Sequence, residues 1–158
     1  MLTNKKSLAK ISVKPGKTRL INHFLINEEW YLVDLPGYGY AKIGKQERKK
    51  WEKFVRKYIL MRENLFCLFV LIDSRHEPQK VDLEFMEWLG MSQVPFAMVF
   101  TKTDKLKSEE LEQNIRNYEA KMLESWEFMP PYFTSSVSTG EGKKEILNYI
   151  QDINRENM

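Results

Sequence analysis

Three short polar motifs stand where apolar segments of the chain end. The segment 30–35 runs into DLPG (residues 34–37), the segment 95–100 into TKTD (residues 101–104), and the segment 132–134 into SSV (residues 135–137). Ligands of mainly parallel sheets bind at the carboxyl ends of the strands. The three motifs are therefore the first places to look for chemistry.

The DLPG motif suits a phosphate and a hard cation. The Asp34 carboxylate can hold Mg²⁺ through its water shell, because Mg²⁺ keeps several waters and takes few carboxylates. Gly37 has no side chain, so a backbone N–H can approach a phosphate closely at this position. Thr18 precedes this motif, and its hydroxyl is the natural candidate for a second Mg²⁺ ligand. The phosphate and metal residues expected here are Thr18, Asp34 and Gly37.

The TKTD motif suits a guanine base. The Asp104 carboxylate can accept hydrogen bonds from N1–H and the N2 amino group of guanine. Adenine lacks this pair of donors, so unpaired polar groups would penalise ATP. The Lys102 stem can lie along the base plane, and backbone N–H groups of SSV can cap guanine O6. The expected base-binding residues are Thr101, Lys102, Asp104, Ser135, Ser136 and Val137.

The elements that must position these motifs alternate along the chain. Apolar periodicity predicts an antiparallel hairpin over 20–26 and 30–35, helices over 45–60, 80–89, 109–125 and 145–155, and strands over 66–73, 95–101 and 132–135. Phe54 and Val81 are predicted to face inward, and Ser108 to cap the third helix. This order favours an α/β fold with a mostly parallel sheet.

Composition indicates one ordinary globular domain over residues 1–158. The longest apolar run, 65–72, is too short to cross a bilayer. It contains the lone Cys67, which suits the core of a protein from a reducing cytoplasm. The net charge is only +3, yet residues 42–57 carry eight Lys or Arg against two Glu. Such clusters favour RNA or phosphates, although each alone is most simply a solvated helix face.

The motifs and their order resemble those of GTPases, and longer stretches resemble one family. SVKPGKTRLIN (residues 12–22) and VDLPGYGYAK (residues 33–42) are similar to the EngB family of bacterial ribosome-assembly GTPases, as are DSRHEP (residues 73–78), TKTD and the serines of SSV. The resemblance implies a small-GTPase-like P-loop NTPase fold of three layers, GTP hydrolysis with Mg²⁺, and assembly of the large ribosomal subunit on ribosomal RNA. It also implies a cytoplasmic monomer linked to cell division and septation, with Thr18 in switch I and Asp34 and Gly37 in switch II.

No side chain is assigned as catalytic. Tyr38 follows DLPG, at the place where many GTPases carry a glutamine that orients the attacking water. Transfer of the phosphoryl group to water would therefore depend on positioning and charge stabilisation. His23 and His76 are interpreted first as structural.

One GTPase element has no counterpart in the sequence. Phosphates are cradled by GxxxxGK[ST], and the nearest match, residues 39–46, ends in Gln46 and follows DLPG. We therefore expect an N-terminally incomplete domain without its first strand, P-loop and most of its first helix, with exposed strand edges and impaired GTP binding. Two alternatives stay open: a non-enzymatic RNA-binding module derived from a GTPase domain, and an inert fragment.

Overall fold

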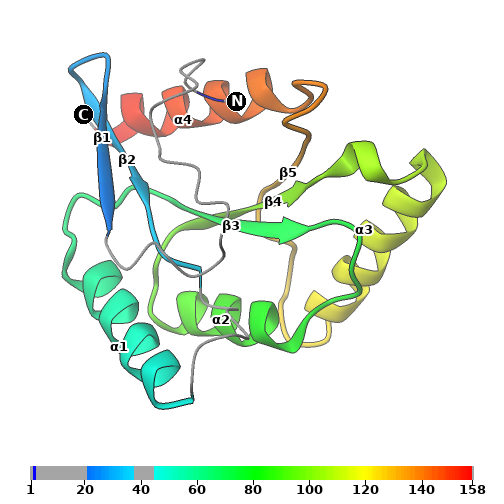
Figure 1. Ribbon diagram of the computed structural model, residues 1–158, viewed down its shortest axis with the longest axis horizontal. Helices are drawn as coiled ribbons and strands as arrows, with labels where there is room; N and C mark the ends of the chain where they lie inside the picture. The colour runs from blue at the N-terminus through cyan, green and yellow to red at the C-terminus, as the bar shows by residue number, and fades with distance from the viewer. Residues whose placement is uncertain (1, 3–20, 38–44, 158) are drawn as a thin grey trace. The chain divides into compact units, whose positions relative to one another are not determined.

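The structure is a computed structural model that describes residue 2 and residues 21–37 and 45–157, with backbone only for residues 45–48 and 51 (Figure 1). Thr18 and Tyr38 lie outside the described residues. The chain divides into two compact units, residues 1–63 and 64–158, and each unit is described by itself.

The first unit contains an antiparallel hairpin. Strand β1 (Asn22–Ile26) pairs with β2 (Trp30–Asp34), as predicted. The turn places Asn27 and Glu28 at φ of 51° and 62°, and the Glu29 N–H donates to the Ile26 carbonyl at 3.0 Å. Two successive left-handed residues are the geometry of a type I′ turn, whose twist matches that of the strands. The hairpin leaves Asp34 at the end of β2.

Helix α1 (Lys45–Met61) follows in the same unit. Among the helix residues whose side chains the structure describes, Val55 and Ile59 are buried, and they lie one turn apart. Phe54 is 49% exposed, so its predicted inward position is wrong. The face of the helix that is buried is narrower than the stripe of apolar residues in its sequence. The helix is joined to β1 by a 2.8 Å hydrogen bond between Tyr58 Oη and His23 Nε2. His23 is thus a partnered surface side chain.

The second unit is built on a parallel sheet. Strands β3 (Leu68–Asp73), β4 (Phe96–Thr101) and β5 (Tyr132–Ser135) lie in the order β3-β4-β5. In the register, Asp73 pairs with Thr101, and Thr101 pairs with Ser135. The last residues of all three strands therefore form one row, and the loops that carry TKTD and SSV leave the sheet at the same edge as the loop after β3.

Helices cover both faces of this sheet. Tyr149 of α4 (Lys143–Asn157) packs against Phe69 and Phe133, while Tyr118 of α3 (Ser108–Met122) packs against Phe100 on the other face. Tyr118 also donates a 3.0 Å hydrogen bond to Asp82 of α2 (Lys80–Met91), which places α2 on the same side as α3 (Figure 1). The unit has three layers, and the predicted α/β fold with a parallel sheet and an antiparallel hairpin is confirmed.

Two local predictions for these helices are wrong. Val81 is 39% exposed, since Phe85, Met86 and Leu89 fill the buried face of α2. Ser108 is the first residue of α3, and Lys107 is its N-cap. The Glu110 carboxylate reaches back to accept the N–H of the N-cap residue Lys107 at 3.1 Å.

Strand β3 ends the sheet within the described part of the chain. Its only strand partner there is β4, and Leu71 is 65% exposed although its neighbours Val70 and Ile72 are buried. An apolar side chain left uncovered on an edge strand is a liability for aggregation. Cys67, just before β3, is partly buried, and burial raises the pKa of its thiol to about 11. Among the described helices, none is long and apolar enough to span a bilayer.

Candidate guanine-nucleotide site

The TKTD motif leaves β4 through a left-handed residue. Lys102 has φ 64° and ψ 31°, and the short 3₁₀ helix η1 (Thr103–Lys105) follows at once. The Lys105 N–H donates to the Lys102 carbonyl at 3.0 Å. Thr101 Oγ1 donates to the Ile72 carbonyl of β3 at 2.9 Å, which anchors the strand end. A non-glycine residue in this conformation is uncommon. Here it turns the chain out of the strand and into η1, which contains Asp104, the third residue after Thr101.

Asp104 is held by the other base motif. The buried Ser136 hydroxyl donates to Asp104 Oδ1 at 2.7 Å, and Lys105 Nζ lies 3.0 Å from Oδ2. The Ser136 hydrogen bond and the neighbouring Lys105 lower the pKa of the Asp104 carboxyl to about 2. A carboxylate has about four lone-pair positions, so an ionised Asp104 keeps acceptor capacity for the two donors of a guanine edge.

The SSV loop is closed by backbone hydrogen bonds. The Ser136 N–H donates to the Glu141 carbonyl at 3.2 Å, and the Gly140 N–H donates to the Ser136 carbonyl at 2.9 Å. Ser135 and Ser136 are buried, whereas Val137 is 80% exposed. The Ser136 N–H is thus already paired with Glu141, and Val137 is the motif residue that is exposed to solvent.

Glycine is required where this loop returns to α4. Gly142 has φ +73°, and a Cβ there would lie 1.8 Å from the Thr134 carbonyl oxygen. The close approach lets the Glu141 carboxylate accept hydrogen bonds from Thr103 Oγ1 at 2.9 Å and Thr134 Oγ1 at 3.3 Å. Glu141 thereby ties the two base motifs together. It was not predicted, and the glycines on both sides of it were the only signal in the sequence.

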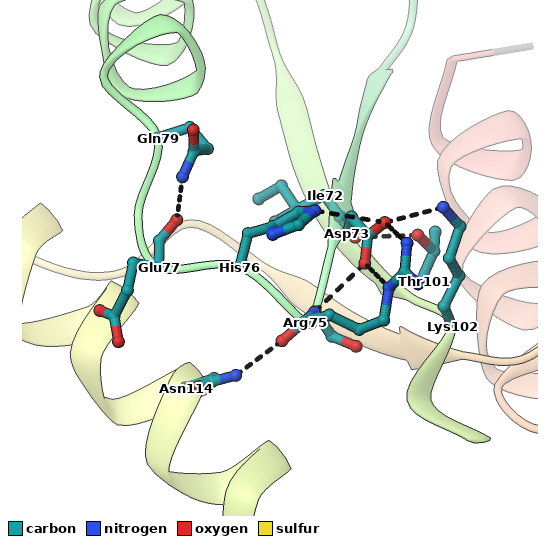
Figure 2. A network of polar contacts seen from close by, with 10 residues as sticks. Ile72, Asp73, Arg75, His76, Glu77, Gln79, Thr101, Lys102 and Asn114 are labelled. Atoms are coloured by element: carbon teal, nitrogen blue, oxygen red, sulfur yellow. Dashed lines mark hydrogen bonds and ion pairs between the residues drawn. The ribbon is translucent and has the colours of Figure 1, made fainter. Parts of the chain in front are cut away.

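A second group of residues meets at the same edge, after β3 (Figure 2). Asp73 accepts hydrogen bonds from Arg75 Nε at 2.8 Å and Nη2 at 2.7 Å, and its Oδ2 lies 2.7 Å from Lys102 Nζ. The Arg75 guanidinium and the Lys102 ammonium hold the pKa of the Asp73 carboxyl well below its usual range, against the opposing effect of partial burial. His76 lies 3.9 Å from the same carboxylate. Asp73 stood in the DSRHEP segment but was not predicted as a site residue.

The predicted phosphate and metal residues belong to the first unit. Asp34 is exposed at the end of β2, where its Oδ2 accepts a 3.4 Å hydrogen bond from Asn22. Gly37 is exposed, with open space where a Cβ would stand. An exposed carboxylate is the hard oxygen ligand that Mg²⁺ prefers, so Asp34 fits the role chemically. Over residues 21–37 and 45–157, no three His, Cys, Asp or Glu gather as for a metal held by protein ligands alone.

The fold and the sequence both match GTPases. The sequence profile of the family described as 50S ribosome-binding GTPase matches residues 1–102. The fold is similar to the crystal structure of a probable GTP-binding protein EngB, with a TM-score of 0.76 at 21% identity over 98% of this chain and 89% of the other. It is also similar to elongation factor SelB from Methanococcus maripaludis with the GTP analogue GppNHp, with a TM-score of 0.61 at 17% identity over 84% of this chain and 27% of the other. Fold and motifs together define a GTPase domain of the P-loop NTPase class.

Sequence relatives narrow this class to one family. The chain is 58% identical to the probable GTP-binding protein EngB of Christiangramia forsetii, over 98% of this chain and 78% of the relative. It is 56% identical to the protein of the same name from Bacteroides thetaiotaomicron, over 99% of this chain and 77% of the relative. The chain belongs to the EngB family of GTP-binding proteins.

Proposed function

We propose that residues 1–158 form one GTP-binding domain that binds GTP and GDP with Mg²⁺, hydrolyses GTP, and acts in assembly of the large ribosomal subunit in the cytoplasm. The observation that carries the nucleotide part is the Asp104 carboxylate, held ionised by the buried Ser136 hydroxyl at 2.7 Å. The family description, 50S ribosome-binding GTPase, supports the ribosomal part. We further propose that the protein acts as a monomer and is linked to cell division and septation.

In this proposal the residues divide between base and phosphates. Thr101, Lys102, Asp104, Ser135, Ser136 and Val137 recognise guanine, since they lie at one edge of the sheet of the second unit. Thr18 and Asp34 supply oxygen ligands for Mg²⁺. Gly37, which has no side chain, lets a backbone N–H approach a phosphate. When bound, the metal would neutralise charge on the phosphate oxygens.

We also propose that this chain binds nucleotide weakly. Its sequence contains no GxxxxGK[ST] segment, and backbone N–H groups of that segment supply much of the phosphate cradle. The base site would then act with little help from phosphate contacts. A monomeric, sharply melting chain with micromolar or tighter GDP affinity would overturn this part of the proposal.

One observation supports an RNA partner, both for the GTPase and for the alternative of an RNA-binding module. On α1, Lys49, Lys53 and Lys57 are exposed at intervals of one turn, and they line a hollow together with Glu52, Arg56, Leu60 and Met61. A row of cations at this spacing can follow a phosphate backbone. The same row would also serve a GTPase that docks on ribosomal RNA, so the row by itself does not separate the two functions.

A competition titration tests the guanine site. The 158-residue chain is titrated with fluorescent GDP and Mg²⁺, and GTP and ATP are added as competitors. We expect displacement by GTP and not by ATP, because adenine cannot donate to Asp104 as guanine does. Asp104→Ala should abolish the selectivity, and Glu109→Gln, which removes an exposed carboxylate at the start of α3, should leave it unchanged.

The base contact can be tested more sharply by exchanging donor and acceptor. Xanthine carries a carbonyl oxygen where guanine carries its N2 amino group, and the amide of an Asp104→Asn variant can donate to that oxygen. This variant should therefore prefer XDP over GDP. Equal competition by GTP and ATP in the wild-type chain would refute the guanine site. RNA affinity that survives Asp104→Ala and falls steeply with salt would favour the RNA-binding module.

A further inference from the structure

The side chain of Lys102 forms an ion pair with a residue outside the TKTD motif. Lys102 is the left-handed residue at which the chain leaves β4, and its side chain is half exposed. Its ammonium lies 2.7 Å from Asp73 Oδ2 and donates a hydrogen bond to it (Figure 2). Asp73 comes from the neighbouring strand β3, where the register places it beside Thr101. The contact therefore joins two strand ends, and residues 29 positions apart in the sequence.

Arg75 fixes the carboxylate that receives the lysine. Its guanidinium donates to both oxygens of Asp73, at 2.8 and 2.7 Å, and its own N–H donates to Oδ1 at 3.2 Å. A bidentate arginine sets the plane of a carboxylate as well as its charge. The loop that carries Arg75 is anchored in turn, since Asn114 of α3 donates to the Ser74 carbonyl at 2.9 Å. Asp73 is thus a fixed acceptor beside a lysine that would otherwise be free to rotate.

We propose that Asp73 is a positioning residue that holds the Lys102 side chain in place for the guanine base, with Arg75 as its brace. The nucleotide part of this proposal rests on the proposed function. The physical reason is entropic: a lysine side chain has many rotamers, and an ammonium held in advance loses less freedom when a ligand arrives. Asp73 touches no base in this arrangement and acts only through Lys102.

Nuclear magnetic resonance tests the anchor without any nucleotide. The ammonium signal of Lys102, assigned with a Lys102→Arg variant, is recorded at low temperature, where hydrogen-bonded ammonium protons exchange slowly enough to be seen. We expect this signal in the wild type, in Asp73→Glu and in Glu77→Gln, which removes a carboxylate from the same loop. It should be lost in Asp73→Asn. A Lys102 signal unchanged in Asp73→Asn would overturn the proposal.

Affinity for GDP tests the consequence. Asp73→Asn should weaken binding about threefold to fivefold, as expected for a partly exposed ion pair. Lys102→Met should weaken it further, and adding Asp73→Asn to Lys102→Met should change nothing, because the lysine through which Asp73 acts is gone. Full additivity of the two losses would show that Asp73 acts by another route. If the wild-type chain shows no guanine-selective binding, the proposed function fails for this chain while the ammonium signal still decides whether Asp73 holds Lys102.

Discussion

Replacing Gly142 by alanine should destabilise the protein far more than the same replacement at Gly140. Both glycines lie in the loop between β5 and α4, with φ of +73° and +81°. Alanine in this region of backbone conformation costs about 1–2 kcal/mol at either position. Only at Gly142 would the new Cβ also meet backbone atoms, at 1.8 Å from the Thr134 carbonyl oxygen, whereas at Gly140 nothing lies within 4 Å.

The overlap at Gly142 must be relieved by moving the backbone, since the obstructing atom belongs to β5 and not to a flexible side chain. Forced overpacking typically costs a further 1–3 kcal/mol, so the total is about 2–5 kcal/mol. That is a large part of a typical stability of about 5–15 kcal/mol. At about 2–4 °C per kcal/mol for a chain of this size, thermal unfolding should fall by roughly 4–20 °C.

The assay is urea and thermal unfolding of both variants beside the wild type, followed by circular dichroism. Gly140→Ala is the matched control, because it carries the conformational cost without the contact, and we expect it to lose about 1–2 kcal/mol. Equal losses for the two variants would refute the reasoning, since they would mean that the loop has room at Gly142. Guanine affinity should also fall in Gly142→Ala, because Glu141, which joins the two base motifs, must move with it.

Two further predictions concern polar contacts. Ser136→Ala should raise the pKa of the Asp104 carboxyl from about 2 toward its usual 3.8, because the hydroxyl that stabilises the ionised form is gone. A carboxyl whose pKa is lowered by folding stabilises the fold at pH values above its unfolded pKa, and this stabilisation is lost as the pH falls through its folded pKa. Between pH 4 and 2 the wild type should therefore lose more stability than Ser136→Ala. The carboxyl chemical shift measures the pKa and acid unfolding measures the stability, with the exposed Ser125→Ala as the control. Tyr58→Phe removes the hydroxyl that contacts His23 and Arg62. It should cost about 0.5–1.5 kcal/mol for each hydrogen bond lost. An unchanged urea midpoint would show that these contacts do not stabilise the fold.

How far the sequence alone predicts the site depends on which residues act together. Apolar periodicity placed β4 and β5 within one residue of their ends, and the polar residues that follow them were correctly expected to meet at one edge. Asp73 and Glu141 were missed, since their roles depend on partners far away in the chain. Ser108 was expected to cap α3 because serine is a good cap residue, but Glu110 reaches back to the Lys107 N–H instead.

By itself the sequence determined the class of the protein, because DLPG, TKTD and SSV follow one another in the order in which GTPases carry these motifs. It also determined the alternation of helices and strands, since apolar spacing along the chain decides which face of each element can be buried. Only the tertiary structure decided which charges share a hydrogen bond. Strand register brings Asp73 beside Thr101, and a register is a relation between segments that no local pattern contains.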